Sequence, residues 1–459
     1  MPTQYHVKKL DKPINWTITV PGSKSMTNRA LLLAALSGDT VTVEGVLFCG
    51  DSRNFLSSLE ALGFALDIDE PGRKITVTGC DGEIPCKEAE IDVGSSGTAA
   101  RFLTAMLGFS DGIYTVKASE QMKKRPMQPL FQLLADAGAQ ITYLEEEGYL
   151  PVRIAGCHYS KMDQREAEAS EVSLSGRPPM DLELDISRST QFLSALLLVS
   201  PMIKQGLHVH ITSEKTDGSY IRITRNMMKE FGVSIAYDGR DYAVAPNVSY
   251  HMDRYVVEPD VSAACYFYAA AAVTGGRVLV WNVHGDNTQG DLRFLEVLRV
   301  MGCAVVEGNL GITVVGPESG MLRGISVDMN DFSDQALTLA AIAPYAKSPV
   351  RIRGIGHIRD QECDRVHAIV TELTKLGILC EEESDAVTIY PGVPHGGVVE
   401  TYDDHRVAMA FSLVGLRTDG IVIDNPECCK KTFEEYFDLL EKLTEETLEE
   451  GKMAPVDCD

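Results

Sequence analysis

The fold is decided by the stretch PGSKSMTNRALLLAALSG, which covers residues 21–38. Pro21 and Gly22 stop a preceding strand, Ser25 is a residue type favoured at a helix N-cap, and the Ala and Leu residues that follow are strong helix formers. The stretch therefore predicts a strand, a tight turn and a helix from Lys24 to Ala35. Because this helix is apolar on nearly all sides, we expect it to be buried all round.

Two cations lie at the start of this predicted helix. Lys24 and Arg29 are close to unpaired backbone N–H groups and to the positive end of the helix dipole, which disfavours further positive charge. A bound anion would relieve the conflict, and a turn whose cations face water is the alternative. The stretch lacks the first glycine and the four-residue spacer of a Walker P-loop, so a nucleoside triphosphate is not implied.

A unit of similar composition recurs along the chain. Each copy begins with small polar residues and continues into an apolar helix, a strand, an amphipathic helix and an alternating segment. The copies are roughly 70 residues apart, except where the polar segment Gly156–Pro179 widens the second interval to roughly 90. The six predicted starts lie at Lys24, Ser95, Ser187, Asp260, Phe332 and Tyr402.

Six copies in a chain of 459 residues indicate two domains with three copies each. The fold class we predict is mixed α/β (α+β), with βαβαββ-like units whose first helix is buried. Residues 1–21 and 258–446 are expected to form one discontinuous domain, residues 22–257 the other, and residues 447–459 an acidic tail. We also expect the first twenty residues to pair with the later half of the chain as an extra strand.

Composition limits the function. The net charge of −24 disfavours nucleic acid and anionic membranes as partners, because both would repel the chain at long range. The eleven cysteines include no CxxC pair, which is typical of reduced thiols in the cytoplasm. No apolar run approaches the ~20 residues of a membrane-spanning helix. We therefore expect a cytoplasmic protein whose anionic ligand, if it has one, is held by a local cluster of basic residues.

The starts of the buried helices carry an unusual collection of polar residues. Capping alone is a sufficient reading for Ser95, Ser262 and Ser333, but Lys and Arg do not cap helix N-termini. If the two domains face each other, these helix starts would bring cations and positive dipole ends to one polyanion site. Further basic elements lie between the copies, at residues 123–125, 359–365 and 430–431.

Taken together, these motifs resemble the 5-enolpyruvylshikimate-3-phosphate synthase family. The likeness runs in order from about Pro21 to Phe433, nearly the whole chain. It is carried by GSKSMTNR (22–29), SGTAAR (96–101), KRP (124–126), STQFL (189–193), ECDR (362–365) and DHRVAMA (404–410).

The resemblance implies the enolpyruvyl transferase fold, an inside-out α/β barrel whose two domains close over substrate. It implies a 3-phosphoshikimate 1-carboxyvinyltransferase of aromatic amino acid biosynthesis, which moves the enolpyruvyl group of phosphoenolpyruvate to the 5-hydroxyl of shikimate 3-phosphate through a tetrahedral intermediate. No metal or organic cofactor is implied, and the partners are these two small molecules. A monomer is expected, and so is binding of the inhibitor glyphosate in the phosphoenolpyruvate half, where Gly97 leaves room.

The resemblance also assigns roles to residues whose motifs match. The catalytic set is Lys24, Asp334, Glu362 and His405, with Asp334 taking the proton of the 5-hydroxyl and Glu362 protonating the C3 methylene. The phosphoenolpyruvate set is Lys24, Gly97, Arg125, Arg365, Arg406 and Lys431. The shikimate 3-phosphate set is Lys24, Ser25, Arg29, Ser189, Thr190, Gln191, Tyr220, Asp334 and Gln361. Purely structural readings exist for the two acids: Asp334 could favour a helix dipole, and Glu362 could only pair with Arg359 or Arg365.

Two departures from the family pattern bear on the acceptor. Gln361 precedes Glu362 where many members have Lys, which removes a cation. Asp217 begins DGSY (217–220) where the family has Ser-Lys-Pro-Tyr, so an acid would face the ring phosphate unless Ser213 or Ser219 substitutes.

These departures keep other readings open. The chain could act on a different acceptor, or bind ligands without turnover, although retention of the four catalytic residues and Lys431 argues against the latter. A UDP-N-acetylglucosamine enolpyruvyl transferase shares the fold, but that family has Asn where this chain has Ser25. It also has a loop cysteine whose surroundings Cys80 and Cys86 do not match.

Overall fold

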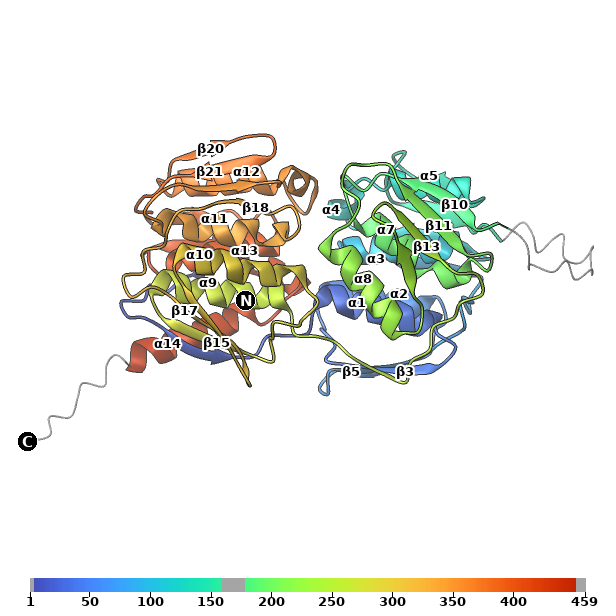
Figure 1. Ribbon diagram of the computed structural model, residues 1–459, viewed down its shortest axis with the longest axis horizontal. Coiled ribbons are helices and arrows are strands. Elements are labelled where there is room, and N and C mark those ends of the chain that lie inside the picture. Colours follow the sequence, from blue (N-terminus) through green and yellow to red (C-terminus); the bar gives the residue numbers. More distant parts are fainter. Residues whose placement is uncertain (1–3, 159–177, 451–459) are drawn as a thin grey trace, which may run out of the picture. The chain divides into compact units, whose positions relative to one another are not determined.

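The computed structural model describes residues 4–158 and 178–450 (Figure 1). Most of the polar segment 156–179 and the end of the acidic tail therefore lie outside the described residues. The chain divides into two compact units: unit 1 comprises Met1–Pro21 and Pro259–Asp459, and unit 2 comprises Gly22–Glu258. Glu258 belongs to unit 2, one residue away from the boundary we predicted. Each unit has its own cluster of buried apolar residues.

Unit 2 is built around three inner helices that contact one another: α1 (Lys24–Leu36), α3 (Gly97–Gly108) and α7 (Gln191–Leu198). Every residue of α3 is buried, and so is α1 from Met26 onward, which confirms the prediction of helices buried on all sides. The outer helices bury one face only. They are α2 (Gly50–Ala61), the short α4 (Glu120–Lys123), α5 (Gln128–Asp136) and α8 (Ser219–Glu230).

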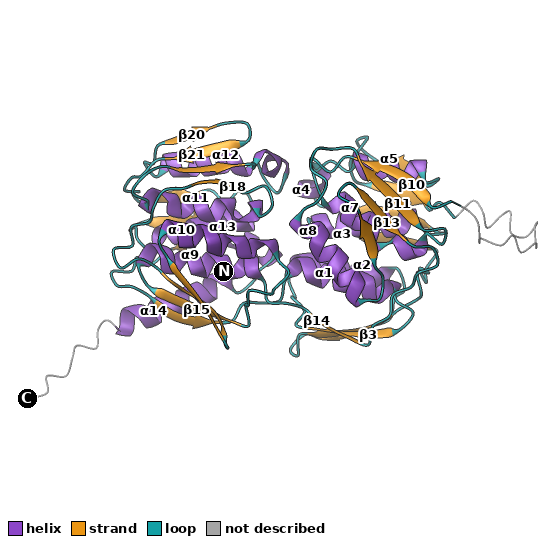
Figure 2. Cartoon of the chain, in the orientation of Figure 1, coloured by secondary structure: helices purple, strands orange, loops and turns teal. Residues whose placement is uncertain are grey.

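Three four-stranded sheets surround these helices, and strands lie outside helices in each unit of Figure 2. In each sheet one parallel pair is followed by two antiparallel pairings. The strand order is β14-β3-β5-β4, β6-β7-β9-β8 and β10-β11-β13-β12. Their bounds are β3 (Thr40–Glu44), β4 (Leu66–Asp69), β5 (Lys74–Thr78), β6 (Glu88–Asp92), β7 (Ile113–Lys117), β8 (Gln140–Tyr143), β9 (Val152–Ala155), β10 (Met180–Leu184), β11 (Leu207–Ile211), β12 (Ile235–Tyr237), β13 (Asp241–Val244) and β14 (Arg254–Val256).

Unit 1 repeats this plan. Its inner helices are α9 (Val261–Thr274), α11 (Ala336–Ile342) and α13 (His405–Gly415), which contact one another. Its outer helices are α10 (Arg293–Met301), α12 (Arg365–Lys375) and α14 (Tyr436–Glu450). Because α14 runs to Glu450, residues 447–450, which we assigned to the tail, belong to a helix instead. No helix among the described residues is long and apolar enough to cross a membrane.

The sheets of unit 1 use strands from both ends of the chain. β2 (Asn15–Ile18) pairs in parallel with β15, and β1 (Gln4–His6) pairs antiparallel with β23, so the expected pairing of the first residues with the later half is confirmed. The strand orders are β16-β17-β15-β2, β18-β19-β21-β20 and β1-β23-β22. Their bounds are β15 (Arg277–Trp281), β16 (Ala304–Gly308), β17 (Gly311–Val315), β18 (Ser326–Asp328), β19 (Val350–Arg353), β20 (Cys380–Glu382), β21 (Ala386–Ile389), β22 (Gly397–Val399) and β23 (Ile421–Asp424).

Helix starts differ in detail from the prediction. Ser25 does not cap α1: the helix begins at Lys24, and Ser23 occupies the N-cap position without a side-chain hydrogen bond. α3 is capped by Ser96, whose Oγ accepts from Ala99 N at 3.2 Å, and not by its neighbour Ser95. Asp260, not Ser262, caps α9. Several small polar residues precede each helix. The sequence therefore indicates that the helix is capped but does not identify which of these residues is the N-cap.

Candidate functional site

The densest polar cluster of unit 1 is centred on Arg365, the first residue of α12. Its guanidinium is buried and donates to both carboxylate oxygens of Asp404, at 2.8 Å from Nε and 3.2 Å from Nη2. It also donates to Glu362 at 2.9 Å and to Asp334 at 3.3 Å. Asp404 is the N-cap of α13, and Asp334 lies in the 3₁₀ turn η3 (Ser333–Gln335) before α11. The starts of three helices therefore meet at one guanidinium.

Two further cations complete this cluster. Arg406 donates from Nη2 to Asp334 Oδ2 at 2.9 Å, and Lys431 Nζ lies 3.2 Å from Glu362 Oε1. Lys431 ends the 3₁₀ turn η6 (Pro426–Lys431). Asp334 thus lies against two arginines, and Glu362 against one arginine and one lysine. Three carboxylates and three cations pair with one another in this cluster, so an anion that binds the cations must compete with the carboxylates.

The charge on Arg365 is maintained despite its burial. Burial lowers the pKa of its guanidinium, but the negative charges of Asp404 and Glu362 raise it by more, and the net shift is upward. Next to it, burial raises the pKa of the Tyr266 phenol, while the Arg406 guanidinium, 3.4 Å from the Tyr266 hydroxyl, lowers it. The arginines therefore act as fixed positive charges.

A second set of polar residues gathers at the helix starts of unit 2. Lys24 Nζ lies 3.3 Å from Oδ2 of the buried Asp51 in α2. In α3, Arg101 donates from Nη1 to the Gly97 carbonyl at 3.1 Å and to Gln191 Oε1 at 2.9 Å. A Cβ atom on Gly97 would lie 2.7 Å from Arg101 Nη1 and 2.8 Å from Arg125 Nη1, so only glycine allows both guanidinium groups to approach this helix end.

Comparison with known proteins identifies the family of this chain. Residues 8–440 match the family model described as EPSP synthase (3-phosphoshikimate 1-carboxyvinyltransferase). The chain belongs to the EPSP synthase family. The 3-phosphoshikimate 1-carboxyvinyltransferase of Trichormus variabilis is 41% identical over 432 residues, covering 94% of this chain and 97% of that protein. The enzyme numbered 2 of Halalkalibacterium halodurans is 37% identical over 438 residues, covering 95% and 93%.

Solved structures support the fold of an EPSP synthase. The EPSP synthase of Acinetobacter baumannii superposes with a TM-score of 0.76 at 25% identity, covering 96% of this chain and 98% of that one. The enolpyruvyl transferase NikO of Streptomyces tendae superposes with a TM-score of 0.69 at 15% identity, with 96% of each chain covered. The predicted enolpyruvyl transferase fold is therefore confirmed.

The EPSP synthase residues predicted from sequence fall into two groups in the structure. Unit 1 holds Asp334, Gln361, Glu362, Arg365, His405, Arg406 and Lys431; hydrogen bonds or ion pairs join six of them directly in the Arg365 cluster, and His405 contacts the cluster through Asp404. His405 is buried at the start of α13, with Nδ1 3.7 Å from Asp404 Oδ1. Unit 2 holds Lys24, Ser25, Arg29, Gly97, Arg125, Ser189, Thr190, Gln191 and Tyr220. The roles assigned to these residues stay predictions.

Arg29 is the buried cation of the unit 2 group that lies within α1. Its guanidinium is fully buried, lies 5.1 Å from the Phe102 ring centre, and donates to Thr224 Oγ1 at 2.8 Å and to the Ser25 carbonyl at 2.9 Å. Burial lowers its pKa to about 10. Tyr220, predicted to stack on the acceptor ring, has its own ring centre 5.7 Å from this guanidinium. Arg29 thus contacts Ser25 and Tyr220, two other residues predicted to bind shikimate 3-phosphate.

Gln361 and Asp217, the two residues that depart from the family pattern, each accept a hydrogen bond from a nearby arginine. Gln361 accepts a hydrogen bond from Arg365 Nη1 through its side-chain oxygen, so it joins the cluster as an acceptor where many members have a cation. Asp217 accepts from Arg222 Nη1 at 3.1 Å and from the Tyr242 hydroxyl at 3.2 Å. The carboxylate we expected to repel a ring phosphate is therefore offset by a guanidinium on α8.

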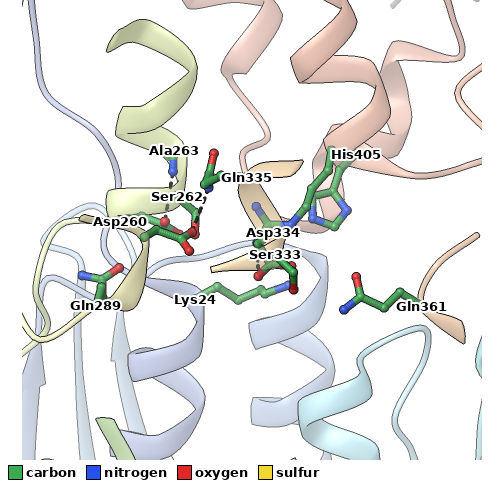
Figure 3. A network of polar contacts seen from close by, with 12 residues as sticks. Lys24, Asp260, Ser262, Ala263, Gln289, Ser333, Asp334, Gln335, Gln361 and His405 are labelled. Atoms are coloured by element: carbon green, nitrogen blue, oxygen red, sulfur yellow. Dashed lines mark hydrogen bonds and ion pairs between the residues drawn. The ribbon is translucent and has the colours of Figure 1, made fainter. Parts of the chain in front are cut away.

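Sequence reasoning missed a buried carboxylate beside Asp334. Asp291, in the 3₁₀ turn η2 (Gly290–Leu292), accepts hydrogen bonds from Ser262 Oγ and, at 2.8 Å, from Gln335 Nε2. Figure 3 shows Ser262 and Gln335 close to Asp260 at the start of α9. Burial and the charge of Asp334 raise the pKa of Asp291 to about 6. Nothing in the local pattern around Asp291 marks it, whereas Asp404 could have been found as the residue before a helix start.

No group of three or more His, Cys, Asp or Glu side chains in residues 4–158 and 178–450 is arranged to hold a metal ion.

Proposed function

We propose that the chain catalyses the reaction of 3-phosphoshikimate 1-carboxyvinyltransferase. The 5-hydroxyl oxygen of shikimate 3-phosphate attacks C2 of phosphoenolpyruvate while C3 gains a proton, which gives a tetrahedral intermediate. Loss of a proton from C3 then expels inorganic phosphate and leaves the enolpyruvyl ether. The observation that carries the proposal is the family match over residues 8–440, within which the Arg365 cluster supplies two acids and three cations.

The proposed roles follow from the partners of each carboxylate. Asp334 accepts the proton of the 5-hydroxyl, and its ion pairs with Arg365 and Arg406 fix the position of the carboxylate. Arg365, Arg406 and Lys431 bind the phosphate and carboxylate of phosphoenolpyruvate, for which guanidinium forks are well suited. His405 orients the groups beside them.

The same competition explains how Glu362 can act as an acid. Glu362 pairs with Arg365 at 2.9 Å and with Lys431 at 3.2 Å. Phosphoenolpyruvate that binds these two cations displaces Glu362 from them and lies beside its carboxyl group, which then protonates C3.

Residues of unit 2 complete the proposed binding sets. Lys24 contacts both substrates and serves as a further proton donor, and Gly97 with Arg125 takes part in binding phosphoenolpyruvate. The residues proposed for shikimate 3-phosphate are Ser25, Arg29, Ser189, Thr190, Gln191, Tyr220, Asp334 and Gln361. We propose in addition that the enzyme acts as a cytoplasmic monomer.

The test is release of inorganic phosphate by the purified protein with phosphoenolpyruvate and one of three acceptors. We expect release with shikimate 3-phosphate, and none with unphosphorylated shikimate or UDP-N-acetylglucosamine. Release with another acceptor alone would replace the proposal by an enolpyruvyl transferase of different specificity. Silence with all three, while phosphoenolpyruvate still raises the melting temperature, would mean that the fold is kept and the acceptor has changed. Binding of both phosphoenolpyruvate and shikimate 3-phosphate without phosphate release would support a binding protein that has lost turnover.

A further inference from the structure

The segment that joins β22 to α13 contains an unusual turn. Tyr402 and Asp403 both have φ of 54°, a left-handed conformation that residues other than glycine rarely adopt, and rarely twice in succession. The turn is closed by Asp404 N, which donates to the Thr401 carbonyl at 2.8 Å. Directly after it come Asp404, His405 and Arg406. The positions of these three residues therefore depend on a turn with a strained backbone, and other contacts must maintain that backbone conformation.

The contact that maintains it comes from Glu372 on α12. This carboxylate is fully buried and accepts hydrogen bonds from the Tyr402 hydroxyl at 2.6 Å and from Glu400 N at 3.1 Å. Lys375 Nζ lies 2.7 Å away and balances its charge. One carboxylate oxygen of Glu372 therefore accepts from Tyr402 in the left-handed turn, and the other accepts from Glu400, two residues earlier.

A second anchor lies on the same helix. Arg365 precedes Glu372 by seven residues, which is about two helical turns, so both side chains leave the same face of α12. Arg365 holds Asp404, and Glu372 holds Glu400 and Tyr402. On the other side of the turn, Asn425 Nδ2 donates to Asp403 Oδ1 at 3.2 Å.

We propose that Glu372 and Tyr402 are positioning residues for the reaction: their hydrogen bond holds the left-handed turn so that Arg406 and His405 keep their places in the Arg365 cluster. This inference rests on the proposed function for its catalytic consequence, but the contact itself can be tested without substrate. One helix, α12, holds both ends of the segment 400–404 through Glu372 and Arg365. The middle of that segment has the strained left-handed backbone conformation.

The first test compares Tyr402→Phe with a matched control. Tyr390→Phe removes a hydroxyl that also donates to a carboxylate, at 2.9 Å to Glu381 on β20, and neither residue belongs to the turn. Without ligands and well below the melting temperature, we expect faster amide hydrogen exchange in residues 400–406 of Tyr402→Phe and unchanged exchange there in Tyr390→Phe. Equal exchange rates in Tyr402→Phe and the wild type would overturn the proposal.

The second test uses kinetics under the same conditions. We expect Tyr402→Phe to lower kcat/KM for phosphoenolpyruvate by about 10-fold or more, as misplaced reacting groups do, and Glu372→Gln to act in the same direction. KM for shikimate 3-phosphate should change less than about twofold, because Arg406 is assigned to the other substrate. Wild-type kinetic constants in a folded Tyr402→Phe enzyme would refute the positioning role, whatever its stability.

The third test is rescue. Glycine adopts φ near 54° without strain, so Asp403→Gly in the Tyr402→Phe background should regain most of the lost kcat/KM. The reference is Asp403→Gly alone, which measures the cost of losing the hydrogen bond from Asn425. A double variant that stays as slow as Tyr402→Phe would show that strain in the turn is not what the hydrogen bond opposes. A wild-type enzyme that releases no phosphate would refute the proposed function, and the exchange comparison would still decide whether the contact holds the turn.

Discussion

Arg365 and Asp404 form a buried two-point ion pair, with Nε 2.8 Å from Oδ2 and Nη2 3.2 Å from Oδ1. The pair joins the first residue of α12 to the N-cap of α13, and Asp404 also accepts from Arg406 N at 2.9 Å. One carboxylate therefore caps a helix, orients the central guanidinium and neutralises part of its charge.

We expect Asp404→Ala to destabilise the protein by roughly 3–5 kcal/mol, because it leaves a buried guanidinium without its main partner. Asp404→Asn keeps a capping side chain and should lose less. The measurement is urea unfolding, with Asp364→Ala as the control. That residue caps α12 but its ion pair with Arg359 is exposed to solvent, so its loss should cost about 1 kcal/mol. Equal losses for the two alanine variants would contradict the role of burial.

Gln361→Lys places a cation beside Arg365 in place of an acceptor. Without ligand we expect a loss of about 1–2 kcal/mol in stability, since a hydrogen bond is replaced by repulsion between like charges. Phosphoenolpyruvate should raise the melting temperature of this variant more than that of the wild type, because an anion relieves the repulsion. Thermal unfolding with and without ligand measures both effects, and an unchanged melting temperature without ligand would argue against the Gln361 contact.

Gly97→Ala should weaken phosphoenolpyruvate binding. The new Cβ would lie within 3.0 Å of the guanidinium groups of Arg101 and Arg125, which must then move. We expect KM for phosphoenolpyruvate to rise about 10-fold or more, with a similar loss for glyphosate, which is proposed to occupy the same half of the site. KM for shikimate 3-phosphate should rise less, because only the contact of Arg101 with Gln191 links it to this change. An equal rise in both KM values would indicate a general disturbance.

Asp291 should make the ligand-free protein less stable as the pH rises. Its pKa is about 6 in the fold, above the usual value near 3.9 of an exposed Asp, so the folded state binds the proton more tightly. The cost of the charged form is absent below about pH 4 and complete above about pH 6. Asp291→Asn should therefore match the wild type near pH 4 and exceed it by on the order of 2 kcal/mol at pH 8. A difference in stability that does not change with pH would contradict this assignment.

The sequence allowed good predictions wherever local pattern decides structure. An apolar run after Lys24 predicted a helix buried on all sides, and Gly302, with φ of 110°, ends α10 in the left-handed conformation that favours glycine. Family motifs named every cation of the Arg365 cluster. The contacts within that cluster could not be predicted, because they join residues far apart in the chain: Arg406 meets Asp334 across 72 positions.

The burial of individual charged side chains also could not be predicted from the sequence pattern. Arg29 and Lys24 are five residues apart at one helix start, yet the guanidinium of Arg29 is fully enclosed while Lys24 keeps 17% of its side chain exposed. Asp291 has a raised pKa because tertiary packing buries it and brings the charge of Asp334 close, although hydrogen bonds from Ser262 and Gln335 lower that pKa in part. Such environments are set by tertiary packing, to which a single sequence gives no direct access.

The pairing of β2 with β15 has a consequence for biosynthesis on the ribosome. Asn15 and Arg277 are neighbours in the sheet but lie 262 positions apart, whereas the last strand of unit 2, β14, is made before α9. A nascent chain can therefore finish unit 2 while its first twenty residues still have no partner strand. Because domains generally fold as they emerge, the N-terminal segment must remain available through that interval, and trapping it early would block the last unit to form.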